Sequence, residues 1–142
     1  MKRITIATLI FALCLLSGCT TFSNAPVPTA ALQPSAVIRF MDVPVPQGFH
    51  LLADDSYAFE SAGLRMAMLR YKGNANIEQV TEFYKLQMPK YRWVLLNLVR
   101  YGQTLINFDR ENETCLITLA PKLTGLLVTI SIAPKQPQTA KK

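Results

Sequence analysis

Histidine and cysteine are scarce in this chain of 142 residues, which contains one histidine, His50, and three cysteines. A zinc site needs several closely spaced His or Cys ligands, and a serine or cysteine nucleophile needs a base within hydrogen-bonding reach. No such group surrounds His50, and no serine lies in a G-x-S-x-G elbow. We therefore predict no catalytic residue, no metal site and no cofactor, and we do not expect an enzyme.

Two short acidic stretches remain as candidates for chemistry, and both have simpler explanations. Asp54 and Asp55 are adjacent in a turn, where aspartate more often bonds to the backbone than works as an acid–base pair. Glu111, Asn112 and Glu113 form a hairpin tip with too few oxygen ligands for a calcium site. Neither stretch changes the expectation of a non-catalytic protein.

A concentrated positive charge is also missing, although the whole chain carries a formal net charge of +6. All nine acidic residues lie within residues 42–133, and six of the fifteen Lys and Arg residues lie outside that range, which leaves nine and nine. A nucleic-acid-binding domain would gather basic residues on its folded surface. We expect no nucleic-acid partner, and we expect the scattered arginines of this range to pair with its acids: Arg65, Arg70, Arg92, Arg100 and Arg110.

The N-terminus has the pattern of a secretory signal. Lys2 and Arg3 precede a nearly uninterrupted apolar run over residues 4–16, and the small residues Ser17 and Gly18 follow it. A helix of about 13 residues spans about 20 Å, less than the ~30 Å core of a bilayer. The run is therefore too short for a comfortable membrane-spanning helix.

Leu16-Ser17-Gly18-Cys19 resembles the lipobox of bacterial lipoproteins. The resemblance implies that residues 1–18 are removed as a signal peptide and that Cys19 becomes the N-terminus and carries lipid. Several acyl chains hold a protein on a bilayer far more firmly than one. Thr20 stands where an aspartate would favour the inner membrane, so the resemblance implies an outer-membrane anchor facing the periplasm if the cell is Gram-negative.

The remaining chain divides by composition. Residues 19–41 contain three prolines and many small residues, which predicts a semi-extended linker whose segment 36–41 is apolar enough to dock on the domain. Residues 42–133 form a single domain, and residues 134–142 form a basic tail that we expect to be disordered. Cys115 alternates with Ile117 and Leu119, so we interpret it as a core residue.

The fold class predicted for the domain is α+β: a two-layer sandwich with one main helix, about 77–88, on one face of an antiparallel meander sheet of about five to six strands. Asn76 and Gln79 have the spacing of a capping box, apolar residues recur at helical steps, and Pro89 stops the helix. The strand over 93–101 is apolar on both sides, so we expect it to be covered on both faces.

A helix ending in Phe-Tyr, followed by a Trp that opens a strand meander, is similar to domains of several uncharacterised bacterial envelope lipoproteins. The order of helix and sheet also resembles the helix-grip domains in lipoproteins of the outer-membrane assembly machinery. The first resemblance implies no activity, and the second implies partner binding by architecture alone.

The last three strands each place one leucine among polar residues on the face away from the helix, namely Leu105, Leu116 and Leu127. We hypothesise that these leucines contact an envelope protein, a second copy or the 36–41 segment; the alternative is ordinary scattered surface leucines. A different function is a carrier of a small apolar ligand held between helix and sheet, in a cavity lined by Phe83, Tyr84, Trp93 and Phe108.

The lipid anchor is directly testable by mass spectrometry of the native protein. We expect the leading fragment to begin at Cys19 and to carry acyl mass. A Cys19→Ser variant should lose the acyl mass and leave the membrane fraction. A native chain with its first eighteen residues intact, or a leading fragment without acyl mass, would contradict the anchor.

Overall fold

A computed structural model describes residues 31–34 and 40–135 of the chain. The helix is α2 (Ile77–Gln87), and the 3-10 turns are η2 (Ala53–Asp55) and η3 (Met88–Tyr91). The strands are β1 (His50–Leu51), β2 (Tyr57–Ser61), β3 (Leu64–Gly73), β4 (Val94–Tyr101), β5 (Gln103–Arg110), β6 (Glu113–Lys122) and β7 (Gly125–Pro134). The predicted signal, Cys19, the 36–39 stretch and most of the basic tail lie outside the described residues.

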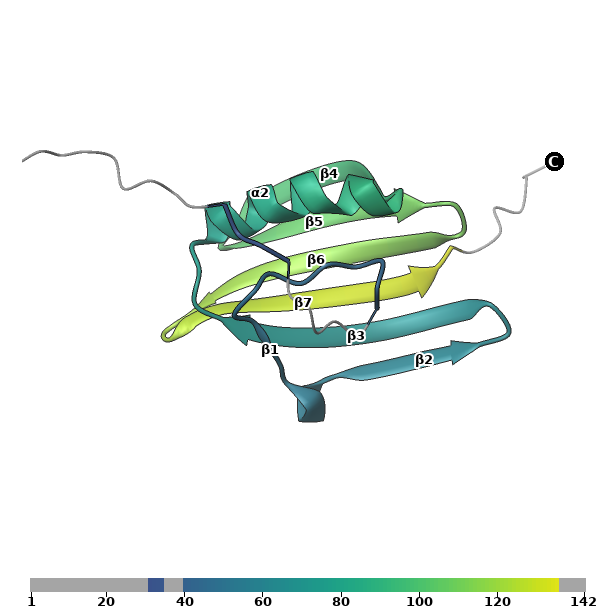
Figure 1. Ribbon diagram of the computed structural model, residues 1–142, viewed down its shortest axis with the longest axis horizontal. Coiled ribbons are helices and arrows are strands. Elements are labelled where there is room, and N and C mark those ends of the chain that lie inside the picture. Colours follow the sequence, from purple (N-terminus) through teal and green to yellow (C-terminus); the bar gives the residue numbers. More distant parts are fainter. Residues whose placement is uncertain (1–30, 35–39, 136–142) are drawn as a thin grey trace, which may run out of the picture.

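The strands form one antiparallel sheet in the order β1-β3-β7-β6-β5-β4, with β2 also paired to β3 (Figure 1). The α+β class is confirmed, but the sheet has seven strands rather than five to six. The difference arises at the N-terminal edge, where the short strands β1 and β2 pair with different parts of β3. The local sequence does not indicate that β1 and β2 both pair with β3.

The helix forms where its end signals predict. The Asn76 side chain accepts a hydrogen bond from the Glu78 amide at 2.7 Å, and the Gln79 side chain accepts one from the Asn76 amide at 3.3 Å. This capping box satisfies amides that have no partner inside the helix. Val80, Thr81, Phe83 and Tyr84 form the buried stripe. Pro89 lies in η3, and Arg92 then takes a left-handed conformation with φ 66°.

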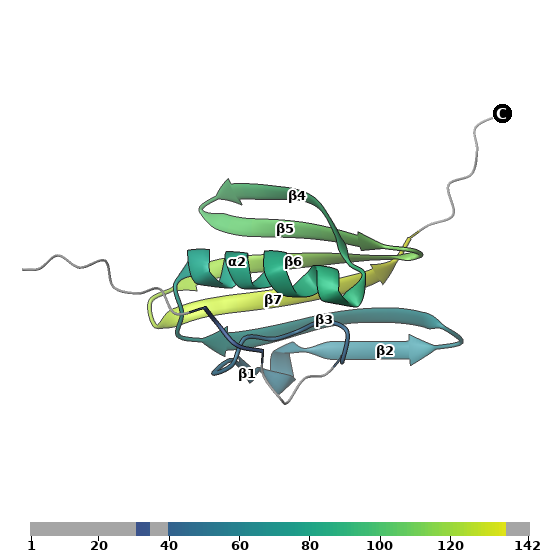
Figure 2. The same cartoon turned by 45° about the horizontal axis from the view of Figure 1, so that its top comes forward.

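The core fills the space between one face of the sheet and two covering segments. Helix α2 packs over β5 and β6, and Figures 1 and 2 show it on a single face of the sheet. The chain before β1 supplies further cover through Val43, Val45 and Phe49, which are buried in the same cluster. Alternate residues of the central strands complete this cluster: Leu69, Tyr71, Ile106, Phe108, Cys115, Ile117, Leu119, Val128, Ile130 and Ile132.

Some described residues outside 42–133 also contact the domain. Leu32 and Phe40 pack against the core, and Gln47 donates its amide to the Gln33 carbonyl at 2.6 Å. At the other end of the chain, Lys135 Nζ lies 2.7 Å from Asp109 Oδ2. The folded unit therefore includes short pieces of the segments predicted to be linker and tail.

Two glycines allow the N-terminal segment to lie close to the sheet. A Cβ on Gly73 would come within 2.5 Å of the Phe49 ring. A Cβ on Gly125, which has φ +97°, would meet the backbone carbonyl of Gly73. Only glycine fits both positions without displacing the strand ends or the Phe49 ring.

Strand β4 differs from its prediction. Its side chains were expected to be covered on both faces, but Val94, Leu96 and Val99 are 61%, 55% and 52% exposed. The reason is position: β4 is an edge strand that pairs only with β5, and the helix packs on β5 and β6. Only Trp93, just before the strand, is fully inside the core.

Within the described residues, the helix of this fold falls short of the length and apolar character that a bilayer crossing requires.

Candidate functional site

The sheet face opposite α2, here called the open face, carries the three leucines named from the sequence. Leu105 and Leu116 are half-buried there and are diagonal neighbours, because Leu105 lies opposite Thr118 and Leu116 lies opposite Asn107. Leu127 is only 8% exposed and lies opposite Ala120, four residues along β6 from Leu116. The structure therefore brings two of the three leucines together and leaves the third apart.

The neighbours of these two leucines form a longer apolar surface. Val99 lies opposite Leu105 at one side, and Ser131 links Leu116 to Met68 at the other. Beyond Met68, β2 adds two aromatic residues, since Tyr57 lies opposite Met68 and Phe59 opposite Met66. We call this set the apolar band, and it consists of Tyr57, Phe59, Met66, Met68, Leu116, Leu105 and Val99.

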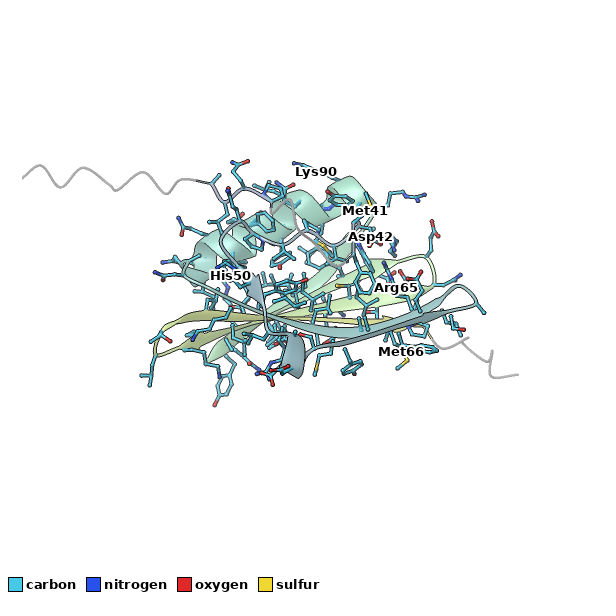
Figure 3. The ribbon with its side chains drawn as sticks, turned by 60° about the horizontal axis from the view of Figure 1, so that its bottom comes forward. Met41, Asp42, His50, Arg65, Met66 and Lys90 are labelled. Carbon is cyan, nitrogen blue, oxygen red and sulfur yellow. The ribbon has the colours of Figure 1, made fainter. Side chains whose placement is uncertain are left out.

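The band crosses the sheet from edge strand to edge strand and is open to solvent. Tyr57, Phe59 and Met66 are 57%, 60% and 47% exposed. Figure 3 shows Met66 directed away from the helix side of the sheet, whereas Arg65 beside it points toward that side. The leucines predicted from the sequence come from alternation in the last three strands alone, so they do not include the β2 and β3 part of the band. The alternation of Leu64, Met66 and Met68 was the available signal.

One end of the open face is basic. His50 lies opposite Lys72 in the sheet, and Lys122 lies on the same face of β6. Neither lysine has a carboxylate partner within residues 31–34 and 40–135. An open groove of about 760 Å³ borders this end and is lined by Gly48, His50, Leu52, Lys72, Gly73, Asn74, Leu123, Thr124 and Gly125. His50 is exposed in β1.

The helix side of the sheet holds a compact ionic cluster. Arg65 binds the Asp42 carboxylate through both terminal nitrogens at 2.8 Å, and it binds the Glu113 carboxylate through Nη2 at 2.8 Å and through Nε at 3.1 Å. Arg110 binds the same two carboxylates, at 2.6 Å and 2.7 Å. The two positive and two negative groups compensate one another, and Figure 3 shows Asp42 and Arg65 meeting between the helix layer and the sheet.

Aromatic rings complete the ionic cluster. The Arg110 guanidinium lies 4.2 Å from the centroid of the Trp93 ring, and the Arg65 guanidinium lies 4.9 Å from that of Phe40. The indole Nε1 of Trp93 donates to the Asp42 carbonyl at 2.9 Å. Cation–π contacts of this kind are stronger when solvent is excluded. The cluster therefore fastens the segment before β1 to β3, β5 and β6.

The electrostatics of the cluster indicate a structural role. Burial raises the pKa of Asp42, but hydrogen bonds from Arg65 and Arg110 and their charges outweigh it, so that this pKa is lowered overall. The Asp42 hydrogen bond is the main reason that the pKa of Arg65 is raised. Groups held in their charged forms by each other are poor proton donors and acceptors at neutral pH.

All five arginines of the domain pair with acids, which confirms the expectation drawn from charge balance. Besides Arg65 and Arg110, the pairs are Arg70 with Asp55, Arg92 with Glu111 and Arg100 with Glu78. The hydrogen bonds of the 53–56 turn come mainly from Ser56, whose hydroxyl donates to the Leu52 carbonyl and accepts from the Arg70 amide. Asp55 thus contributes an ion pair rather than the expected turn hydrogen bond.

The remaining reactive groups are buried. Cys115 has no exposed surface, and burial is the main cause that raises the pKa of its thiol to about 12. Burial likewise raises the pKa of Tyr84, whose hydroxyl has no hydrogen-bond partner in the part of the chain described. No group of three or more potential metal-ligating side chains occurs among residues 31–34 and 40–135.

The side chains named for a ligand cavity are packed in the core. Phe83, Tyr84, Trp93 and Phe108 are 3% exposed or less. A groove of about 310 Å³ lies on the outer side of α2, between it and residues 31–33, and Phe83 is the only one of the four that borders it. This geometry does not favour the carrier function.

No protein-family model matches this chain, and neither a curated protein nor a solved structure shows significant similarity to it. The apolar band, the basic end of the open face and the ionic cluster are therefore the features from which a function can be inferred.

The ionic cluster predicts how stability depends on pH. Because the pKa of Asp42 is lower in the folded protein than in the unfolded chain, its contribution is present above about pH 4 and is lost as the pH falls through the folded-state pKa. Asp42→Asn should lower the free energy of unfolding at pH 7 by about 1–3 kcal/mol. Urea unfolding should show this deficit shrinking below pH 4.

Asp54→Asn is the matched control, since Asp54 is exposed and has no ion pair among the described residues. Its unfolding free energy should stay within about 0.5 kcal/mol of the wild type at every pH. An Asp42→Asn deficit that is constant from pH 7 to pH 2.5 would contradict a contribution from the ionised carboxylate.

Cys115 should resist alkylation in the folded protein. The high pKa leaves little thiolate at pH 8, and burial blocks access. Iodoacetamide should modify Cys115 at least about 100 times faster in 8 M urea than in buffer, as followed by mass spectrometry of the peptide. Equal rates in both conditions would show that the thiol is exposed in the native state.

Proposed function

We propose that this protein is a membrane-anchored lipoprotein of the bacterial envelope that has no catalytic activity and binds or scaffolds another envelope component through its open face. The observation that carries the proposal is the apolar band, in which Tyr57, Phe59, Met66 and Val99 remain about half exposed. These residues lie in register across the sheet rather than scattered over the surface.

The chemistry of the band suits a protein partner. Aromatic and methionine side chains are enriched in the buried centres of protein interfaces, and methionine adapts to irregular partner surfaces. A contiguous apolar surface leaves water in unfavourable contact with it until a partner covers it. The basic end with Lys72 and Lys122 adds a rim that would favour an acidic edge on the partner.

The anchor and the fold together define the reach of the open face. The resemblance at Leu16–Cys19 supports lipidation of Cys19, and contacts with the domain begin at Leu32. The intervening chain of about a dozen residues spans at most about 40 Å when fully extended. Leu32 would then lie within that distance of the membrane, with the open face on the far side of the sheet, in the periplasm if the anchor is in the outer membrane of a Gram-negative cell.

Site-specific photo-crosslinking in living cells tests this proposal. A benzoyl-phenylalanine probe at Phe59 or at Leu116 should give one adduct of defined mass, because both positions lie in the apolar band. The same probe at Leu86, which is 61% exposed on α2, is the control and should give at most about a tenth of that adduct.

A second substitution separates specific binding from general stickiness. Met66→Asp places a charge in the band at an exposed position, so it should reduce the Phe59 adduct at least tenfold while the circular dichroism spectrum stays unchanged. Adducts of equal yield from Leu86 and Phe59, or adducts that survive Met66→Asp, would reject the open face as the binding surface.

A further inference from the structure

Strand β4 has the composition of an interior strand in the position of an edge strand. Its outer side pairs with no other strand among the described residues. Apolar residues occupy both of its faces: Val94 and Val99 lie on the open face, whereas Leu95 and Leu98 lie on the helix side. Edge strands usually carry charges or prolines that prevent further pairing, and β4 has one charged residue, Arg100, and no proline.

A bulge limits which part of β4 can accept another strand. The register with β5 shifts between Leu95 and Asn97, so Leu96 is an extra residue there. Bulges disrupt the regular ladder on an edge strand. The five residues after it, 97–101, keep an uninterrupted register with β5 and present a regular edge.

The charge on this segment is compatible with pairing to an identical strand. Arg100 binds Glu78 of its own chain, with 2.8 Å between Nη2 and Oε2. Two copies of the segment in antiparallel order therefore bring no uncompensated like charges together. The opposite edge of the sheet is less suitable, because it is divided between β1 and β2 by the turn that contains Asp54 and Asp55.

We propose that two copies of this chain pair antiparallel through residues 97–101 of β4, with Val99 opposite Val99 of the second copy at the two-fold axis. Leu98 then lies opposite Arg100 of the second copy, and Asn97 lies opposite its Tyr101. This pairing brings Val99 and Tyr101, which are 52% and 90% exposed in the single chain, against the second copy.

The two-fold pairing goes beyond the proposed function, and it enlarges the apolar surface on which that function rests. Antiparallel edge pairing about a two-fold axis perpendicular to the sheet keeps both open faces on the same side. Val99 is the last residue of the apolar band, so the two bands join at the axis into one. Both α2 helices, and both copies of Leu32, lie on the other side of the combined sheet.

Disulfide crosslinking of the full-length chain in its native membrane tests the pairing. In the proposed register the Cα atoms of the two Val99 residues are about 4.5–5.5 Å apart, within the range that a disulfide bridges. After mild oxidation, at least about half of Val99→Cys should run as a dimer on a non-reducing gel. Val94→Cys is the control, on the same strand and face and similarly exposed, but its two copies would be about 27 Å apart, because the bulge leaves Val94 four regular ladder positions from Val99.

A charge exchange tests the same axis without cysteine. Val99→Lys alone should reduce co-purification of two differently tagged copies at least tenfold, and co-expression of Val99→Lys with Val99→Glu should restore it. The pairing would be overturned if Val99→Cys stayed monomeric on the non-reducing gel, or if Val94→Cys crosslinked equally well. It would also be overturned if Val99→Cys formed crosslinks only to a different protein. The two dimer assays do not require a partner protein bound to the apolar band. Their outcome is therefore independent of whether probes at Phe59 and Leu116 give photo-crosslinked adducts.

Discussion

Seven strands offer two broad faces, and the described chain has one helix to cover them. Helix α2 covers β5 and β6, and the segment before β1 covers the adjoining part of the same face through Val43, Val45 and Phe49. The apolar residues of the central strands that point toward these two segments are buried. Several of those that point the other way, and several on the outermost strand, stay in contact with water, among them Met66, Phe59 and Val99. Both the apolar band and the exposed edge of β4 are consequences of this one-sided cover.

The segment before β1 can serve as cover only because the ionic cluster fastens it. Asp42 comes from that segment, while Arg65, Arg110 and Glu113 come from three different strands. Phe40 and Trp93 enclose two of the guanidinium groups, which strengthens the ion pairs by excluding water. The cluster thus holds Phe40 and Asp42 on the helix side of the sheet, beside the area that α2 covers.

The absence of a catalytic centre remains a prediction. Cys115 is buried, which raises the pKa of its thiol, and the carboxylates of the ionic cluster are bound to arginines. The molecule exposes to solvent a broad sheet surface with apolar side chains across it and lysines at one end. Such a surface is suited to binding, and its partner would be recognised by an apolar surface with acidic residues at one edge.

Local signals in the sequence were sufficient for the helix at Ile77–Gln87, for the alternation that buries Cys115, Ile117 and Leu119, and for the pairing of arginines with acids. These features depend on neighbours a few residues apart or on overall charge balance. Tertiary structure decided that β4 is an edge, that Leu127 is covered while Leu116 is not, and that Asp42 meets Arg65 and Arg110. Those outcomes depend on register between strands that are distant along the chain, because a side chain's environment is set by the strand beside it and by what packs above it.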